Sequence, residues 1–140
     1  MTELKIKKVE NEKELKQVFN IRKKVFIEEQ NVPVDVEMDE FDETAEHFIA
    51  YIGVTPIGCA RIRTNGFVKL ERIAIAKEHR RKGYGTQLTE YLIDISKKDN
   101  KEIIMHSQGY VKNFYKKFGF EIVGEPFYEG GIEHIKMVLK

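Results

Sequence analysis

A basic, glycine-containing turn is the part of this 140-residue sequence best suited to bind a ligand. Residues 80–85 contain three consecutive cationic side chains followed by Gly83-Tyr84-Gly85. An apolar segment, 70–75, precedes the turn, and an amphipathic segment that predicts a helix follows it. The turn would then bring three kinds of positive group to one point: unpaired backbone amides, the positive end of the helix dipole and the cationic side chains. Such an arrangement binds phosphate groups, although a basic surface loop is the alternative.

Two common nucleotide-binding motifs do not fit this turn. The sequence contains no G-x-x-x-x-G-K-[ST] string of the P-loop type. The dinucleotide motif G-x-G-x-x-G fails because Leu88 stands at the third glycine position. The next apolar segment, 102–105, ends at His106 and not at an acidic residue that would hold a ribose. The string that the turn does match is R-x-x-G-x-G.

This string, at Arg80, Gly83 and Gly85, resembles the acyl-CoA pyrophosphate loop of the GNAT superfamily of N-acetyltransferases. The proline that often precedes the loop in that family is absent here, where Ile75-Ala76-Lys77 stands. A second string at 113–120, N-F-Y-K-K-F-G-F, is similar to the family's Y-x-x-x-G-F pattern. The ElaA-type branch is the most similar, through matching segments at 25–33, 39–48 and 131–137 and through Gln108. The resemblance therefore covers nearly the whole chain.

The resemblance implies acetyl-CoA as the cosubstrate. Backbone groups of Ile73 and Ile75 would hold the pantetheine arm, and one amide there would polarise the thioester carbonyl. Core packing is the alternative for both side chains, and a solvent-facing helix position is the alternative for Asn113. The residues that the resemblance assigns to the cosubstrate are Ile73, Ala74, Ile75, Arg80, Arg81, Lys82, Gly83, Tyr84, Gly85, Thr86, Gln108 and Asn113.

Tyr115 matches the family tyrosine that protonates the departing CoA thiolate. A phenol with a pKa near 10 stays protonated at neutral pH and can donate as the bond to sulfur breaks. The alternative is an aromatic anchor, because Phe114, Phe118 and Phe120 surround it in the sequence. The resemblance favours the catalytic role.

The general base is assigned to Glu71, with an ion pair to a neighbouring cation as an equally weighted alternative. Strand alternation would turn the side chain of Glu71 the same way as that of Ile73, two residues later. His47, His106 and His134 are the other candidates, because histidine titrates near neutral pH.

The segment 28–46 contains nine acidic residues and no lysine or arginine. An acidic wall beside the acceptor cleft would favour a cationic amine, and a solvated acidic loop is the alternative. We expect no metal site, because no D-x-[DN]-x-[DN]-G loop is present.

The composition excludes several other classes of function. A formal net charge of +1 gives no general attraction to nucleic acid. Cys59 is the only cysteine, so an internal disulfide is impossible and a cytoplasmic location is expected. The N-terminal residues do not resemble a signal peptide, and no apolar run approaches the length of a membrane span.

Hydrophobic periodicity predicts an α+β fold with a mixed, mainly antiparallel sheet flanked by helices, the order of elements in the GNAT fold. The strands are expected at 4–9, 47–52, 57–63, 67–76, 102–105, 120–124 and 132–139. The helices are expected at 13–27, 83–97 and 109–118, with an irregular segment at 31–44. Residues 1–140 would form one domain.

Together these features predict an N-acetyltransferase that moves an acetyl group from acetyl-CoA directly to a primary amine of a small molecule or peptide. Cys59 is the only thiol that could carry an acyl-enzyme, and it is expected to be a buried packing residue. The alternative function is a non-catalytic acyl-CoA-binding sensor or partner module on the same fold. The sequence does not decide between a monomer and a homodimer.

Overall fold

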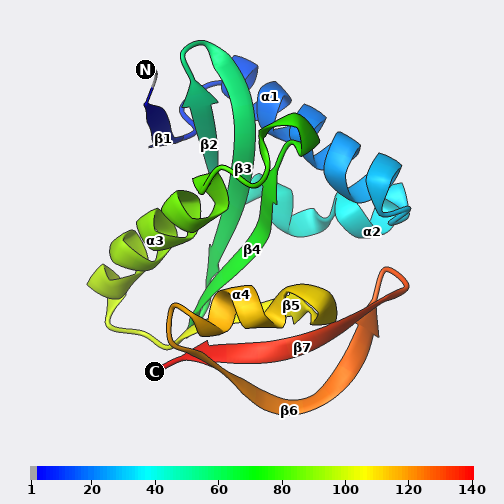
Figure 1. Cartoon of the computed structure of the whole chain (residues 1–140), viewed down its shortest axis with the longest axis vertical. Coiled ribbons are helices and arrows are strands. Elements are labelled where there is room, and N and C mark those ends of the chain that lie inside the picture. The colour runs from blue at the N-terminus through cyan, green and yellow to red at the C-terminus, as the bar shows by residue number, and fades with distance from the viewer. Residues whose placement is uncertain (1–2) are drawn as a thin grey trace.

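The computed structural model of the chain describes residues 3–140, which build one seven-stranded sheet. Its strand order is β1-β2-β3-β4-β5-β7-β6 (Figure 1). The strands are β1 (Leu4–Lys8), β2 (Glu46–Ile52), β3 (Thr55–Thr64), β4 (Val68–Ile75), β5 (Ile103–Gln108), β6 (Phe120–Glu129) and β7 (Ile132–Leu139). The β4–β5 pair is parallel and the other pairs are antiparallel. This confirms the predicted α+β architecture.

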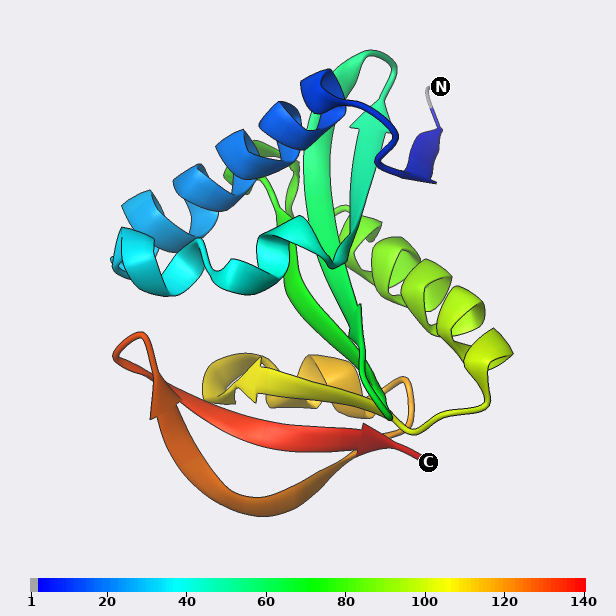
Figure 2. The same cartoon turned by 180° about the vertical axis from the view of Figure 1, so that it is seen from behind.

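The helices cover both faces of the sheet (Figures 1 and 2). They are α1 (Glu12–Arg22), α2 (Val34–Glu37), α3 (Tyr84–Ser96) and α4 (Lys112–Lys116). A π-helical turn, η1 (Lys23–Glu29), continues α1, and a 3₁₀ turn, η2 (Glu40–Glu43), follows α2. Within residues 3–140, no helix has the length and apolar character that a membrane crossing requires.

Two apolar cores lie on opposite faces of the sheet. Leu88 and Leu92 recur one helical turn apart on α3 and are buried against β4, together with aromatic residues of α4. On the other face, Val18 and Val25 of α1 and η1 pack against Cys59 of β3. The central strands are therefore buried on both faces, which explains their continuous apolar character.

Strands β4 and β5 pair over a short length and then separate. Their ladder joins Val68–Leu70 to Ile103–Met105, although β4 continues to Ile75 and β5 to Gln108. Figure 2 shows the two halves of the sheet diverging from this junction. A cleft between the free ends of β4 and β5 follows from this topology.

A β-bulge at Arg72 changes which way the side chains of β4 point. The β3–β4 ladder pairs Glu71 with Arg61 and then Ala74 with Cys59, so one extra residue is accommodated on β4. Arg72 has a φ of 54°, in the left-handed region. Leu70 and Ile73 consequently face the same core, although they are three residues apart. The prediction that Glu71 and Ile73 face the same way is wrong, because the bulge reverses the alternation between them.

The segment 31–44, predicted to be irregular, contains α2 and η2. Pro33 precedes the first residue of α2 with a φ of −57°, which suits a helix start. Asp39 accepts a hydrogen bond from the Phe41 amide, and Asp42 accepts one from the Asp39 amide, so the two carboxylates cap η2. Polar composition here reflects capping and ion pairing, not a lack of structure.

Other boundaries differ from the prediction by a few residues. Strand β6 extends to Glu129 and β5 to Gln108, beyond the predicted ends at 124 and 105. Helix α4 covers only Lys112–Lys116, since residues 109–111 form a 3₁₀ turn before it. Strand β6 extends further because the residues after Gly124 bulge outward and then pair with β7 again.

Candidate active site

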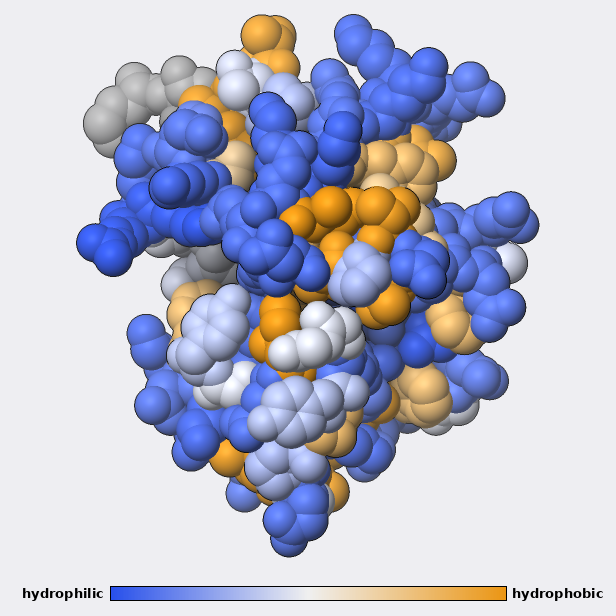
Figure 3. All heavy atoms as spheres, turned by 90° about the vertical axis from the view of Figure 1, so that its right-hand side faces the viewer, coloured by the Kyte–Doolittle hydropathy of each residue, from blue (hydrophilic) through white to orange (hydrophobic). Residues whose placement is uncertain are grey.

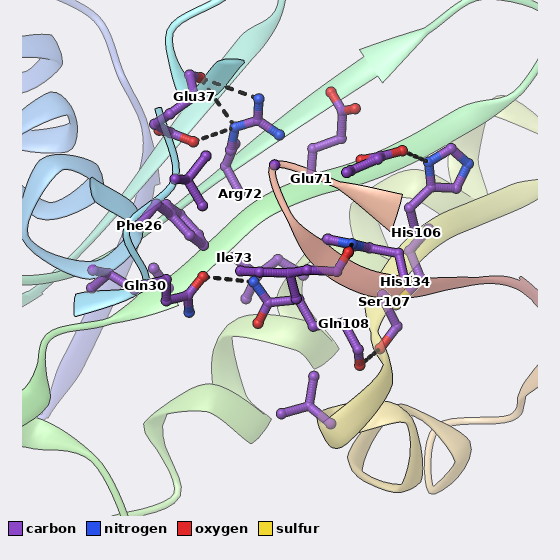
Figure 4. A pocket seen from close by; sticks show the side chains of 18 of the residues that line it. Phe26, Gln30, Glu37, Glu71, Arg72, Ile73, His106, Ser107, Gln108 and His134 are labelled. Atoms are coloured by element: carbon purple, nitrogen blue, oxygen red, sulfur yellow. Dashed lines mark hydrogen bonds and ion pairs between the residues drawn. The ribbon is translucent and has the colours of Figure 1, made fainter. Parts of the chain in front are cut away.

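A cavity of about 750 Å³ occupies the cleft between β4 and β5. Its walls come from those two strands, the end of η1, the segment that contains α2, helix α4 and the β6–β7 turn. Figure 3 views the molecule from the right-hand side of Figure 1 and shows apolar side chains at the centre, framed by hydrophilic ones. Figure 4 shows side chains of several of these elements around the hollow.

The structure brings most of the predicted site residues to this cavity or to a smaller neighbour. Those that line the larger cavity are Glu71, Ile73, Ala74, Ile75, Arg80, Gly85, Gln108 and Tyr115. A second cavity, of about 280 Å³, is lined by Ile75, His79, Arg80, Arg81, Gly83, Tyr84, Gly85, Thr86 and Phe114. Lys82 and Asn113 lie outside the lining of both cavities.

The second cavity is formed by the basic turn and the start of α3. Gly83 precedes the helix with a φ of 83°, a conformation that glycine adopts without steric cost. Apart from Gly83 and its two chain neighbours, no heavy atom of the described residues lies within 4 Å of the position that a Cβ of Gly83 would take. Because Ile75, Arg80 and Gly85 line both cavities, the helix start and the cleft form adjoining parts of one site.

Arg80 links the basic turn to the opposite wall. Its Nη1 and Nη2 atoms donate to the two carboxylate oxygens of Glu29 at 2.9 and 2.8 Å. Its Nε atom donates to the carbonyl oxygen of Ile75 at 2.9 Å. An incoming phosphate would therefore compete with Glu29 for this guanidinium. Phosphate contact by Arg80 stays a prediction.

Tyr115 is buried in the wall of the larger cavity, with a side chain that is 9% exposed. Its ring makes edge contacts with Phe114 and Phe120, as the aromatic-anchor alternative requires. Burial raises the pKa of the phenol, so the hydroxyl stays protonated at neutral pH. Tyr115 therefore packs the core and also lines the cavity, while its role as a proton donor stays a prediction.

Glu71 is the centre of an ion network. Its carboxylate accepts hydrogen bonds from Arg61 at 3.0 and 2.8 Å and from Arg63 at 2.9 and 3.2 Å, and Lys69 lies 3.0 Å away. Burial opposes ionisation of Glu71, but the Arg63 hydrogen bond and the charges of Arg61 and Lys69 outweigh it. They lower its pKa to about 2. The ion-pair alternative describes this geometry, and a carboxylate so stabilised is a weak base.

The acidic segment 28–46 presents no free acidic wall among the described residues that line the cavity. Its three lining carboxylates are Glu29, Glu37 and Asp39. Each is paired with arginine, the partners being Arg80 for Glu29, Arg22 and Arg72 for Glu37, and Arg61 and Arg72 for Asp39. Internal arginines pair with the carboxylates that face the cavity, so these groups do not form a free acidic wall, and a preference for a cationic acceptor stays a prediction.

Comparison with known proteins decides the family. A family model described as the acetyltransferase (GNAT) domain matches residues 7–140. The chain belongs to the GNAT acetyltransferase family.

Named relatives agree with this assignment. The uncharacterized N-acetyltransferase YjcF of Bacillus subtilis is 37% identical over 131 residues, covering 91% of this chain and 94% of the relative. Protein ElaA of Escherichia coli is 28% identical over 127 residues, covering 86% and 83%. The E. coli ElaA crystal structure has a TM-score of 0.88 at 25% identity and covers both chains completely. A GNAT family acetyltransferase from Elizabethkingia anophelis, crystallised with acetyl-CoA bound, has a TM-score of 0.68 at 18% identity and covers 96% of this chain and 94% of its own. The predicted GNAT fold and the resemblance to ElaA are confirmed.

A hydrogen-bonded group that sequence patterns do not predict crosses the cleft of this GNAT protein (Figure 4). The Nε2 atom of Gln108 on β5 donates to Oε1 of Gln30 at 2.6 Å, while the Tyr110 hydroxyl donates to Oε1 of Gln108 at 2.5 Å. Gln30 follows η1, on the opposite wall. The two glutamines are 78 positions apart, so only the fold brings them together.

Two of the three candidate histidines line the larger cavity of this acetyltransferase. The Nδ1 atom of His134 lies 2.7 Å from the Ile132 carbonyl oxygen, which requires a proton on Nδ1 and leaves Nε2 as an acceptor in the neutral ring. His106 instead pairs through Nδ1 with Glu129 at 2.9 Å. His47 is buried outside the cavity lining, and burial lowers its pKa.

The Glu71 network makes stability depend on pH. A carboxylate with a folded-state pKa of about 2 and an ordinary value of 4.5 stabilises the folded state fully above pH 4.5, and this contribution is lost as the pH falls towards 2. We expect Glu71→Gln to lower the free energy of unfolding at pH 7 by about 3 kcal/mol, with the difference from the wild type shrinking between pH 4.5 and 2. Urea unfolding at several pH values measures this. An equal difference at pH 7 and pH 2.5 would contradict it.

Proposed function

We propose that the protein transfers an acetyl group from acetyl-CoA directly to a primary amine. The observation that carries this proposal is that the cavity at the basic turn adjoins the cleft between β4 and β5. Ile75 and Gly85 line both cavities, so a pyrophosphate at the start of α3 would direct the rest of the molecule along β4. The relative crystallised with acetyl-CoA supports the choice of cosubstrate.

Tyr115 is proposed as the proton donor. The amine nitrogen attacks the thioester carbon, the bond from carbon to sulfur breaks, and the phenol gives its proton to the departing thiolate. Its position in the cavity wall and its protonated state support this role. Burial raises the pKa of Cys59 to about 12, so this thiol is not suited to carry an acyl-enzyme. Direct transfer fits the residues at the site better.

His134 is proposed as the general base in place of Glu71. The Ile132 carbonyl fixes its tautomer, so that Nε2 can accept a proton from the attacking amine. His134 pairs in register with Gln108, which places it at the end of β5, beside the cleft. Glu71 lies on the opposite face of β4 from Ile73 and is held by three cations.

A cytoplasmic location is also part of the proposal, supported by a single, buried cysteine. The acceptor is a small-molecule or peptide amine, and its further chemistry is left open because the lining carboxylates of the acidic segment are neutralised.

The cosubstrate site is tested by Gly83→Ala. Alanine at a φ of 83° strains the turn, so we expect the Kd for acetyl-CoA to rise at least about tenfold in calorimetric titration, with ATP and NADH as control ligands. Gly66→Ala is the matched control, since Gly66 has a φ of 72° and equally open space but lines neither cavity. Equal affinity of the two variants would count against the pyrophosphate site.

The proton donor is tested by Tyr115→Phe. We expect turnover with a responsive primary amine to fall about 100-fold while the Kd for acetyl-CoA stays nearly constant. Tyr91→Phe serves as a control, because Tyr91 packs against the same core from α3 without lining the cavity. Unchanged turnover in the Tyr115 variant would remove the proposed acid and favour a non-catalytic acyl-CoA-binding protein.

The base is tested by comparing His134→Gln with His106→Gln. A general base must be unprotonated to accept the proton of the amine, so kcat/KM of the wild type should fall on acidification, and this limb of the pH profile should disappear in the His134 variant. The His106 variant should keep it. If the limb disappears in the His106 variant instead, His106 is the base.

A further inference from the structure

An arginine of β4 has an unfavourable backbone conformation beside the larger cavity. Arg72, in the middle of β4, has a φ of 54°. The left-handed region favours glycine or asparagine and disfavours a long side chain. Such a conformation persists only where the surrounding structure holds it. The contacts of the Arg72 side chain therefore matter for the shape of the strand.

The Arg72 side chain is held by the end of α2 and the residues beside it. Its Nε atom lies 2.7 Å from Oε2 of Glu37, and its Nη2 atom donates to the Glu37 carbonyl oxygen at 3.1 Å. Further contacts from Nη2 reach the Val36 carbonyl oxygen at 3.3 Å and Asp39 Oδ2 at 3.2 Å. Glu37 is itself fixed by the buried Arg22, at 2.5 Å. We call this set of contacts the Arg72 clamp (Figure 4).

At the bulge, the peptide unit between Arg72 and Ile73 is not part of the pairing between β4 and its neighbouring strands. The described ladders pair Glu71 and Ala74 with β3 and stop at Leu70 on the β5 side, so Arg72 and Ile73 stand outside both. The Arg72 carbonyl oxygen accepts the Cys59 thiol from β3 at 3.7 Å. In a trans peptide the carbonyl and the next N–H point in opposite directions, so the Ile73 N–H points away from Cys59, towards the cleft.

We propose that Arg72 is a positioning residue for acetyl transfer: its clamp maintains the left-handed bulge that aims the Ile73 amide at the thioester carbonyl oxygen. The inference rests on the proposed function and adds to it. A donor fixed before the reaction stabilises the negative charge that develops on that oxygen. Glu37 and Asp39 also line the cavity. The contacts of Arg72 with these two residues would therefore hold both this wall of the cavity and the Ile73 amide in place.

Two substitutions separate the backbone role of Arg72 from its charge. Arg72→Ala removes the clamp and keeps the steric penalty of the left-handed conformation, whereas Arg72→Gly removes both. Arg63→Ala is the charge control, since Arg63 also lines the cavity and is bonded to Glu71 but lies outside the bulge.

The measurement is the carbonyl ¹³C signal of bound acetyl-CoA labelled at that carbon, recorded without an amine. We expect a downfield shift on binding to the wild type and loss of most of this shift with Arg72→Ala. The shift should be close to that of the wild type with Arg72→Gly and with the control Arg63→Ala. With a responsive amine, kcat should fall on the order of tenfold or more with Arg72→Ala and recover with Arg72→Gly, while KM for acetyl-CoA changes little.

Equal losses in the alanine and glycine variants, or wild-type signals in both, would overturn the inference. A wild type that binds acetyl-CoA without any carbonyl shift would overturn it and leave the proposed function standing. A wild type that does not bind acetyl-CoA would overturn both. If Arg72→Ala does not fold, Asp39→Asn removes one acceptor of the clamp and should give a smaller loss in the same direction.

Discussion

The short pairing between β4 and β5 is the constraint on which the site depends. Three residue pairs hold the two halves of the sheet together, and beyond them both strands continue apart. The backbone N–H and C=O groups of a strand inside a sheet are normally hydrogen-bonded to the neighbouring strands. Where two parallel strands separate, these groups are free to face a ligand. The cavity occupies this opening, and the basic turn and Tyr115 border it. The bulge at Arg72 lies where the strands separate, which makes the backbone geometry of one residue important for the whole cleft.

Buried ion pairs hold the segment that contains α2 in place. Arg22 and Arg61 are almost fully buried, and each is bonded to carboxylates from η2 or from the residues around it. Removing one partner from such a network leaves an uncompensated charge inside the protein. This destabilises the folded state far more than the loss of an exposed ion pair does. The network therefore fixes the α2 segment against β3 and β4. Of the two roles that the sequence left open for Glu71, general base or ion-pair partner, the geometry matches the second, because its carboxylate is bonded to three cations.

The sequence was sufficient for the fold, and most of the residues that it assigned to the cosubstrate line one of the two cavities, for reasons that are local. Glycine and arginine spacing at 80–85, the alternating strands and the periodicity of α3 each express a backbone or packing requirement within a few residues. The sequence was insufficient where a feature of the site depends on a contact between residues that are far apart in the chain. The Gln30–Gln108 bond, the pairing of Glu37 with Arg72, and the reversal of alternation at the bulge depend on tertiary structure. The misassigned direction of Glu71 follows from that last point, because no residue type marks position 72 as a bulge.

The Arg80–Glu29 pair has a consequence for how a polyanion would reach this protein. Arg80 carries its own counter-ion, so its charge is largely cancelled at distances beyond a few ångströms. Long-range steering would then depend on the neighbouring Arg81 and Lys82, which have no such partner among the described ion pairs. Arg80 would act only at contact, by exchanging a carboxylate for a phosphate. Such an exchange would release Glu29 from its ion pair with Arg80 when the cosubstrate binds. The η1 wall on the opposite side of the cleft would then lose one of its contacts, so binding of the cosubstrate would be coupled to the mobility of that wall.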